Sequence, residues 1–297
     1  MSDPFTAGET FLLAEARLVE RRLFATCFRN APAAGVLDAL RGYQNDDGGF
    51  GHALEPDTRC PASLPIYVEI AFQVCAAAGA ADPGMLGRAC DFLSRTATQA
   101  AADGAVPLAF PIIESYPRAE HWTQWTYEPG LNPTAGLAGL LYQLGFDHPW
   151  RDAATRFCWQ ALETGTLPVE VHALMETLLF LQHVPDRTRA EKHLAAVLEH
   201  LSAQPMFHLD PQTAGYGLSP LQIAPTPDSP TRKFFSEAQL TAHLDHLAQA
   251  QQADGGWPIT WEPPSAASRL EWRGWVTLQA MRTLHAYGRL EPVAVSS

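Results

Sequence analysis

The sequence predicts an all-α fold in which inner and outer helices alternate around a central cavity. One block of residues occurs twice at matched spacing, as Leu40-x3-Gln44-x3-Gly48-x-Phe50 and as Leu247-x3-Gln251-x3-Gly255-x-Trp257. Repetition at fixed spacing is the signature of repeat architectures. Strongly apolar segments also alternate with amphipathic ones, as a two-layer ring requires, and no stretch has a convincing strand pattern.

Each copy of the block predicts a stiff corner between two helices. Its Leu and Gln, four residues apart, share one face of a helix that is ending, and Gly-Gly supplies the positive φ at the C-cap that stops the helix. Asp47 and Asp254 precede the glycines, so we expect them to accept hydrogen bonds from free backbone N–H groups of the turn. Phe50 and Trp257 are expected to fold back onto the helix ends.

About eleven helices are expected in a single domain that spans residues 1–297. The clearest predicted helices are residues 10–28, 33–43, 65–78, 83–98, 133–144, 149–163, 168–182, 186–203, 236–252 and 267–287. Asn132 is expected to be the N-cap of the helix that begins at Pro133. The Pro-rich connections 103–131 and 205–235 also carry aromatic side chains, which favours ordered coverings of the cavity mouth.

The composition of the chain limits the kinds of molecule that it is expected to bind. The net charge of −12 argues against nucleic acid and against an anionic membrane surface, because both are bound through basic patches. No apolar run has the roughly 20 residues that a transmembrane helix needs, and the first residues do not read as a signal peptide. Five cysteines without C-x-x-C spacing predict reduced thiols, so we expect a cytoplasmic protein.

The duplicated block resembles the QW-type repeat of terpenoid cyclases and protein prenyltransferase β-subunits, which fold as α/α toroids. The resemblance lies in Gln44–Phe50 and Gln251–Trp257. It implies an α/α toroid with its active site in the central cavity, and an apolar, isoprenoid-like ligand. The D-x-D-D and D-D-x-x-D motifs of the cyclases are absent, and Asp57 and Cys60 do not have the spacing of the prenyltransferase zinc site.

Three polar clusters precede the predicted inner helices, where a toroid would place the rim of its cavity. The first cluster follows the first corner: we predict that Glu55 and Asp57 supply acid catalysis, with His52 and Arg59 binding substrate. Carboxylates and a guanidinium this close also form ion-pair networks that order a loop, and that alternative stays open.

The second and third clusters are rich in aromatic residues. Large rings in a loop either fill the interior or line a pocket, and an aromatic wall stabilises a carbocation through cation–π contact. The predicted substrate-binding residues of these two clusters are Trp122, Trp125, Tyr127, Trp261, Glu271, Trp272 and Arg273.

The sequence calls for no metal and no cofactor. His172 and Glu176 are four residues apart on a predicted inner helix, but no H-E-x-x-H pattern completes a metal site. His243 and His246 are expected to be solvated on an outer helix. Dinucleotide-binding, phosphate-binding and nucleophile-elbow motifs are absent from the sequence.

Three interpretations of function follow. The first is a terpenoid-cyclase-like or prenyltransferase-like protein that binds a small apolar ligand and carries out acid-initiated chemistry. The second is a carbohydrate-active α/α barrel, because Asp254–Pro258 also looks like a segment of some α/α pectate lyases. The third is a non-catalytic toroid that serves as a scaffold, because function depends on the site and not on the fold.

Overall fold

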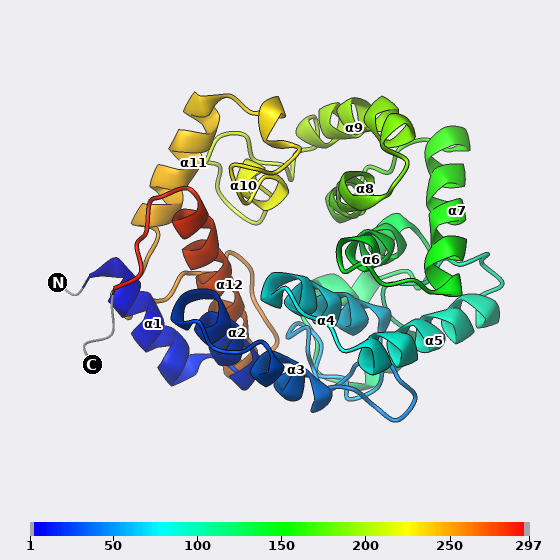
Figure 1. Ribbon diagram of the computed structural model, residues 1–297, viewed down its shortest axis with the longest axis horizontal. Helices are drawn as coiled ribbons and strands as arrows, with labels where there is room; N and C mark the ends of the chain where they lie inside the picture. The colour runs from blue at the N-terminus through cyan, green and yellow to red at the C-terminus, as the bar shows by residue number, and fades with distance from the viewer. Residues whose placement is uncertain (1–2, 294–297) are drawn as a thin grey trace. The chain divides into compact units, whose positions relative to one another are not determined.

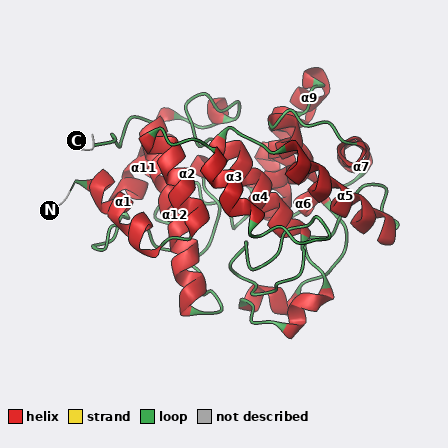
Figure 2. Ribbon diagram, turned by 60° about the horizontal axis from the view of Figure 1, so that its bottom comes forward, coloured by secondary structure: helices red, strands yellow, loops and turns green. Residues whose placement is uncertain are grey.

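The computed structural model describes residues 3–293, and within that range the chain is all-α. It has twelve α-helices and three short 3-10 helices joined by loops, with no β-strand in the described part of the chain (Figures 1 and 2). The all-α prediction is therefore confirmed. The chain forms two compact units: unit 1 comprises the residues up to Pro32 and from Pro205 onward, and unit 2 comprises Ala33–Gln204.

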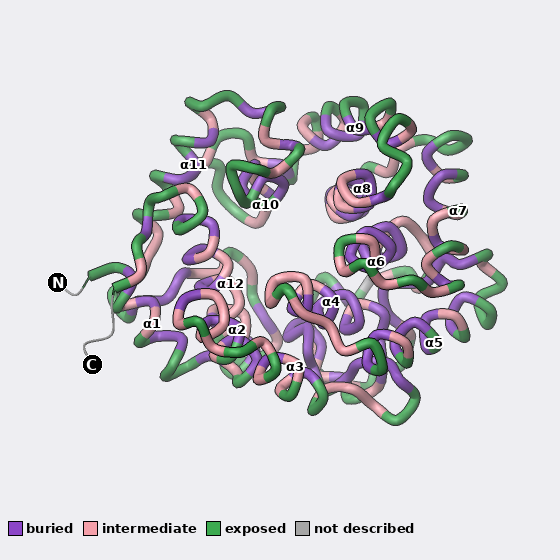
Figure 3. The backbone as a smooth tube through the Cα atoms, in the orientation of Figure 1, coloured by how far each residue is buried: buried purple, intermediate pink, exposed green. Residues whose placement is uncertain are grey.

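Unit 2 is built around three apolar helices, α4, α6 and α8. Helix α6 packs against both α4 and α8, and its residues 133–141 are all buried (Figures 1 and 3). A Cβ on Gly139 of α6 would lie 2.9 Å from the backbone of Leu179 and Phe180, so glycine is needed for α6 and α8 to approach this closely. The remaining helices of unit 2 have more polar surfaces. The α-helices of unit 2 are α3 (Ala34–Arg41), α4 (Pro65–Ala78), α5 (Pro83–Gln99), α6 (Leu131–Gln143), α7 (Pro149–Thr164), α8 (Val171–His183) and α9 (Arg187–Ser202).

Unit 1 is organised by its longest helix, α12, which packs against α1, α2 and α11. Phe5, Phe24 and Phe28 form an aromatic cluster beside it, with ring centroids 5.2–5.9 Å apart. Burial of such rings contributes to the stability of this unit. The α-helices of unit 1 are α1 (Pro4–Glu15), α2 (Leu18–Arg29), α10 (Pro220–Ile223), α11 (Glu237–Gln249) and α12 (Ala266–Ala286).

The two predicted corners have the same hydrogen-bond pattern. The Gln44 side-chain amide donates to the carbonyl of Gly48 at 2.9 Å, and the Gln251 amide donates to the carbonyl of Gly255 at 2.9 Å. The carboxylates of Asp47 and Asp254 accept the backbone N–H two residues later, at 3.0 and 3.1 Å. The prediction that the acidic residue accepts a hydrogen bond from a backbone N–H of the turn is confirmed in both copies.

The match between the corners extends to the helix that each corner packs against. Gln44 also donates to the carbonyl of Met85 in α5, and Gln251 also donates to the carbonyl of Pro4 in α1. The first glycine of each corner lies against the same helix three residues further on, at Arg88 and at Ala7. Helix α1 therefore has the same position relative to the second corner as α5 has relative to the first.

The glycine turns do not cap the helices as predicted. Helix α3 ends at Arg41 and α11 ends at Gln249, so both glutamines lie beyond the helical residues. Gly48 and Gly255 do have positive φ, +90° in each, but they act in the loop that follows the helix end. The aromatic residues are buried as expected, and the Trp257 indole N–H donates to the carbonyl of Leu247 at 2.7 Å.

The single helix predicted at 10–28 is two helices, α1 and α2, so this prediction is wrong. Ala16 and Arg17 are extended, although no glycine or proline marks the break. Local contacts accompany the break: the Arg17 guanidinium pairs with the buried Glu20 carboxylate at 2.5 Å, and the Arg21 Nε donates to the carbonyl of Ala16 at 2.6 Å.

Smaller corrections concern helix ends and histidines. Helix α6 is assigned from Leu131, but Asn132 has non-helical φ and ψ of −95° and 113° directly before Pro133, and its side-chain amide donates to the carboxylate of Glu170 at 3.1 Å. His243 is buried and its Nε2 lies 3.0 Å from the carbonyl of Leu209, so it is not solvated. The 205–235 connection contains the short helix α10 and the 3-10 helix η3 (Arg232–Phe234), which were not predicted. All five cysteines are free thiols.

No helix in residues 3–293 combines the length and the apolar character that crossing a membrane would require.

Candidate functional site

The loop that carries the predicted acids is buried within unit 2. The side chains of Glu55 and Asp57 are 5% and 4% exposed. The hydroxyl of Tyr67 on α4 anchors this loop, because it donates to the carbonyls of Thr58 and Cys60 at 2.9 and 3.2 Å. Burial raises the pKa of Tyr67, so this hydroxyl keeps its proton and remains a donor. The burial of this loop could not be predicted from the sequence, because its composition is polar.

The same loop pairs with the segment that leads into the second predicted cluster. The N–H of Ala119 donates to the carbonyl of Asp57 at 2.8 Å, and the N–H of Arg59 donates to the carbonyl of Pro117 at 2.9 Å. These bonds place the 3-10 helix η2 (Glu120–Gln124) beside the loop, with His121 Nε2 3.8 Å from a carboxylate oxygen of Asp57. The structure therefore brings the first two predicted clusters together.

The aromatic residues of the second cluster differ in burial. Trp122 is buried, and its ring centroid lies 5.1 Å from that of the half-buried Trp125. The indole N–H of Trp122 has no hydrogen-bond partner among the described residues. Tyr127 lies apart from this pair and donates its hydroxyl to Glu114 at 2.9 Å. His52 is exposed, with a φ of +59°.

The third predicted cluster belongs to unit 1. Trp261 packs edge-on against both Trp272 and Tyr216, with centroid distances of 5.2 and 5.5 Å. Glu271 is half-buried at the start of α12. Trp261, Glu271 and Trp272 stay predicted substrate-binding residues.

Arg273 supports the second corner. Its guanidinium donates two hydrogen bonds to Asp254, at 2.7 and 2.8 Å, and a third to the carbonyl of Trp257 at 3.1 Å. It also lies over the ring of Phe11, 4.5 Å from the centroid. The hydrogen bonds from Arg273 hold the pKa of Asp254 below its usual value. All three guanidinium nitrogens are therefore used inside unit 1.

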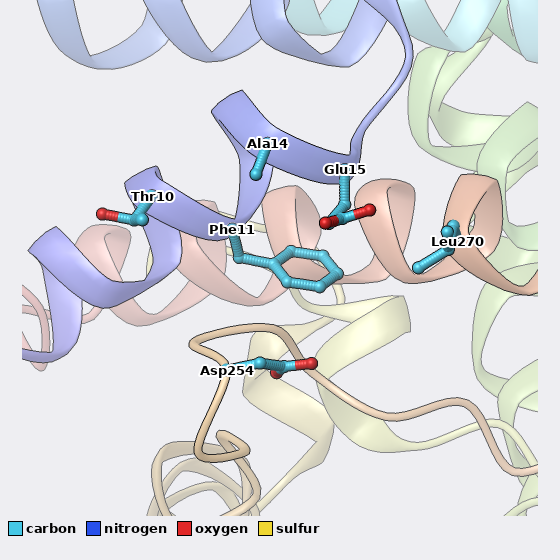
Figure 4. Close-up of a pocket in the computed structure, with 6 residues that line it drawn as sticks. All are labelled: Thr10, Phe11, Ala14, Glu15, Asp254 and Leu270. Carbon is cyan, nitrogen blue, oxygen red and sulfur yellow. The ribbon is translucent and has the colours of Figure 1, made fainter.

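A shallow hollow of about 240 Å³ lies beside this corner in unit 1. Figure 4 shows Phe11 projecting from α1 over the loop that carries Asp254, with Leu270 of α12 at the side. The Asp254 carboxylate, which lines this hollow, already forms an ion pair with Arg273. The hollow therefore offers a ligand few unused polar groups.

The sequence did not single out the pair of acids that the structure brings together in the interior of unit 2. Glu69 of α4 and Glu176 of α8 are each 3% exposed, and their carboxyl groups lie near enough to each other to interact. The Gln73 amide donates to Glu69 at 2.8 Å. The Oε2 of the buried Glu176 receives no N–H or hydroxyl donor among the described residues. A proton held between the two carboxyl groups satisfies both observations, because two ionised carboxylates would repel each other.

Burial raises the pKa of both acids. Burial raises the pKa of Glu69 to about 7, partly offset by hydrogen bonds and by the nearby His172. Burial and the neighbouring Glu69 raise the pKa of Glu176 well above its usual value. The pair titrates as a unit, and it retains a proton near neutral pH. Perturbed acids of this kind are candidates for general acid catalysis.

A glycine on the intervening helix makes room for the pair. A Cβ on Gly136 of α6 would overlap the Oε2 of Glu176. We expect Gly136→Ala to push the Glu176 carboxyl away from Glu69 and to change the titration of the pair, which carboxyl carbon chemical shifts measured by NMR against pH report directly.

Gly139→Ala is the matched control, since it adds the same methyl group one turn along α6. Its Cβ would meet the backbone of α8 and not a carboxyl group. It is expected to cost roughly 1–3 kcal/mol of stability by overpacking and to leave the titration of the pair in place. Equal titration curves for wild type and Gly136→Ala would show that the contact with Glu176 does not hold the pair.

The first turn of α8 carries a second polar group beside the acid pair. Glu170, the N-cap of α8, accepts the N–H groups of His172 and Ala173 at 2.8 and 2.7 Å. It also lies 2.6 Å from the Nδ1 of His172. Burial raises the pKa of Glu170, but the hydrogen bonds and the charge of His172 outweigh it, so its pKa lies below the usual value. Glu170 is therefore an anion that orients His172.

The sequence contained signals for this site. Glu69 is the one acidic residue in the apolar segment 65–78, and Glu176 follows His172 by one helical turn on another apolar segment. A carboxyl group in a helix that is buried on most sides is an exception that requires a partner. The described residues contain no group of three or more His, Cys, Asp or Glu side chains arranged to hold a metal ion.

Comparisons with protein-family models, with curated proteins and with solved structures returned no match.

Proposed function

We propose that the protein is an enzyme that protonates an uncharged, apolar substrate, in the manner of the acid-initiated cyclases that its repeated block resembles. The observation that carries this proposal is the buried, interacting pair Glu69 and Glu176, which holds a proton near neutral pH. An acid of this kind in apolar surroundings is suited to general acid catalysis.

In the proposed reaction the proton of the acid pair passes to a carbon–carbon double bond of the substrate. A carboxylate remains on the pair and a carbocation forms on the substrate. The cation then loses a proton or is captured by water, and the pair takes a new proton from solvent. Trp122 and Trp125, whose rings lie 5.1 Å apart in the segment beside Asp57, are proposed to stabilise the cation through their faces.

An uncharged substrate suits this part of unit 2 better than a diphosphate. Glu69, Glu176 and the ionised Glu170 interact electrostatically with one another. A cluster of acids repels a polyanion. This favours cyclisation or hydration of an olefin over prenyl transfer from a diphosphate.

We further propose that the helices form a single α/α toroid over residues 1–297, with the substrate in its central cavity. The equivalent placement of α1 and α5 against the two corners supports this proposal, since it makes α1 the outer helix that follows α12. The five free thiols suit a cytoplasmic setting.

Glycoside hydrolysis is less well supported by the same pair. Retaining and inverting enzymes hold their two carboxyl groups about 5 Å or more apart. Glu69 and Glu176 interact strongly enough to shift each other's pKa, which is the behaviour of acids held closer together than this.

The test is incubation with a panel of linear and cyclic isoprenoid olefins and alcohols in D2O, followed by mass spectrometry of the products. Protonation of a double bond by the acid pair puts one solvent deuterium on carbon. We expect Glu69→Gln and Glu176→Gln each to lower the rate of deuterium incorporation about 100-fold or more. Glu55→Gln and Asp57→Asn serve as comparison variants, because the sequence predicts these two residues as the acids.

Two outcomes would contradict the proposal. One is deuterium incorporation that persists in Glu69→Gln and Glu176→Gln but is lost in Glu55→Gln or Asp57→Asn. This result would show that the loop residues, and not the pair, supply the acid. If no olefin is turned over and none raises the melting temperature, the pair is an interior structural contact and the scaffold interpretation is favoured.

A further inference from the structure

We infer that His172 transfers protons between solvent and the buried acid pair, and that Glu170 and Asn132 position it for this task. The inference rests on the proposed function of Glu69 and Glu176 as a general acid. An acid buried to this degree must regain its proton after each turnover, so a group that reaches both solvent and the pair is required.

The position of His172 on α8 meets that requirement. His172 and Glu176 are four residues apart in the same helix, so their side chains lie on one face, one turn apart. The side chain of His172 is 33% exposed, whereas Glu176 is 3% exposed. His172 therefore lies between the surface and the pair along the helix. Its charge also acts on Glu69 across the helix packing, lowering the pKa of that acid.

The orientation of His172 is fixed by its neighbours. Glu170 lies 2.6 Å from the imidazole Nδ1, and Glu170 is itself held by two backbone N–H groups and by the Asn132 amide at 3.1 Å. A carboxylate that holds one imidazole nitrogen fixes the ring orientation and directs the other nitrogen toward a second partner. Asn132 therefore helps to hold the carboxylate that orients His172.

The titratable groups around His172 come from several elements. Glu69 is on α4, Glu176 and the N-cap Glu170 belong to α8, and His121 is on η2. His121 interacts with His172, and burial together with this charge lowers the pKa of His121. Asp57 lies 3.8 Å from His121. Of the two histidines, His172 shares a helix with Glu176 one turn away and acts on Glu69, so it is the one assigned as the exchanging base.

The test measures proton uptake by the pair without any substrate. A rapid pH jump from 8.5 to 5.5 is followed by infrared absorption of protonated carboxyl groups, with the band of the pair assigned by its loss in Glu69→Gln and Glu176→Gln. We expect His172→Gln to slow the appearance of this band about tenfold or more and to leave its final amplitude at the wild-type level. His183→Gln is the matched control, since His183 is a half-buried histidine at the other end of α8.

Chemical rescue separates proton transfer from a structural role. Imidazole added to His172→Ala is expected to restore part of the lost rate, which an effect of misfolding would not allow. If the wild type shows no band that depends on Glu69 and Glu176, the proposed function itself fails. If the band is present and His172→Gln and His172→Ala respond at the wild-type rate, the acid pair stands and the role of His172 is overturned.

Discussion

Gly255→Ala is expected to destabilise unit 1 by roughly 3–5 kcal/mol. Gly255 has a φ of +90°, which strains any residue with a Cβ, and that Cβ would overlap the backbone carbonyl of Ala7. A backbone atom of a packed helix cannot move aside as a flexible side chain can. Urea unfolding followed by circular dichroism gives the loss of stability.

Gly215→Ala is the matched control for backbone strain. Gly215 has a φ of +92°, and nothing lies within 4 Å of the position that its Cβ would occupy. We expect this variant to lose only about 1–2 kcal/mol, from strain alone. The difference between the two variants isolates the contact between the corner and α1. Equal losses in the two variants would show that α1 does not pack against the corner as described.

The corner motif was the part of the structure most accessible from sequence. Its Asp, Gly and aromatic residues perform local roles that depend on a few neighbouring backbone groups, so spacing alone predicted them. The partner helix of each corner was not predictable, because Pro4 and Gln251 are brought together only by the tertiary fold. The break after Glu15 was missed because the extended Ala16 and Arg17 are marked by neither glycine nor proline.

The candidate site shows a related limit. Charged residues concentrated in one loop drew attention to Glu55 and Asp57, and the structure does bring their loop beside His121. The acid pair was missed because Glu69 and Glu176 are more than 100 residues apart in the sequence and on different helices. Each looked like an isolated exception in an apolar helix. The pairing of such exceptions depends on helix packing, and here on the space that Gly136 leaves.

The acid pair makes the stability of unit 2 depend on pH with a definite sign. The pKa of Glu69 is raised from 4.5 to about 7, so between these values the folded protein keeps a proton that the unfolded chain releases. The free energy of unfolding therefore falls as pH rises through this window, by on the order of 3 kcal/mol, and is highest at the acidic end. At pH values above this window, the contribution of Glu69 to the free energy of unfolding no longer changes with pH.

Glu176→Gln is expected to stabilise the protein at pH 8 and to leave its stability nearly unchanged at pH 5. The amide can still hydrogen-bond to Glu69 and needs no proton from solvent to stay uncharged in the interior, which is worth about 1–3 kcal/mol at the higher pH. At pH 5 the wild-type pair is already protonated, so little changes. Urea unfolding at the two pH values measures the effect.

Glu199→Gln removes the same charge from an exposed position on α9 and is expected to stay within about 0.5 kcal/mol of wild type at both pH values. A Glu176→Gln variant that is destabilised equally at pH 5 and pH 8 would contradict the shared proton. Stabilisation at pH 8 together with loss of deuterium incorporation would mean that the chain retains an energetically unfavourable acid pair. A destabilising group that persists in a folded interior is the pattern expected where activity and stability conflict, so this combined result would connect the energetics of Glu176 to catalysis.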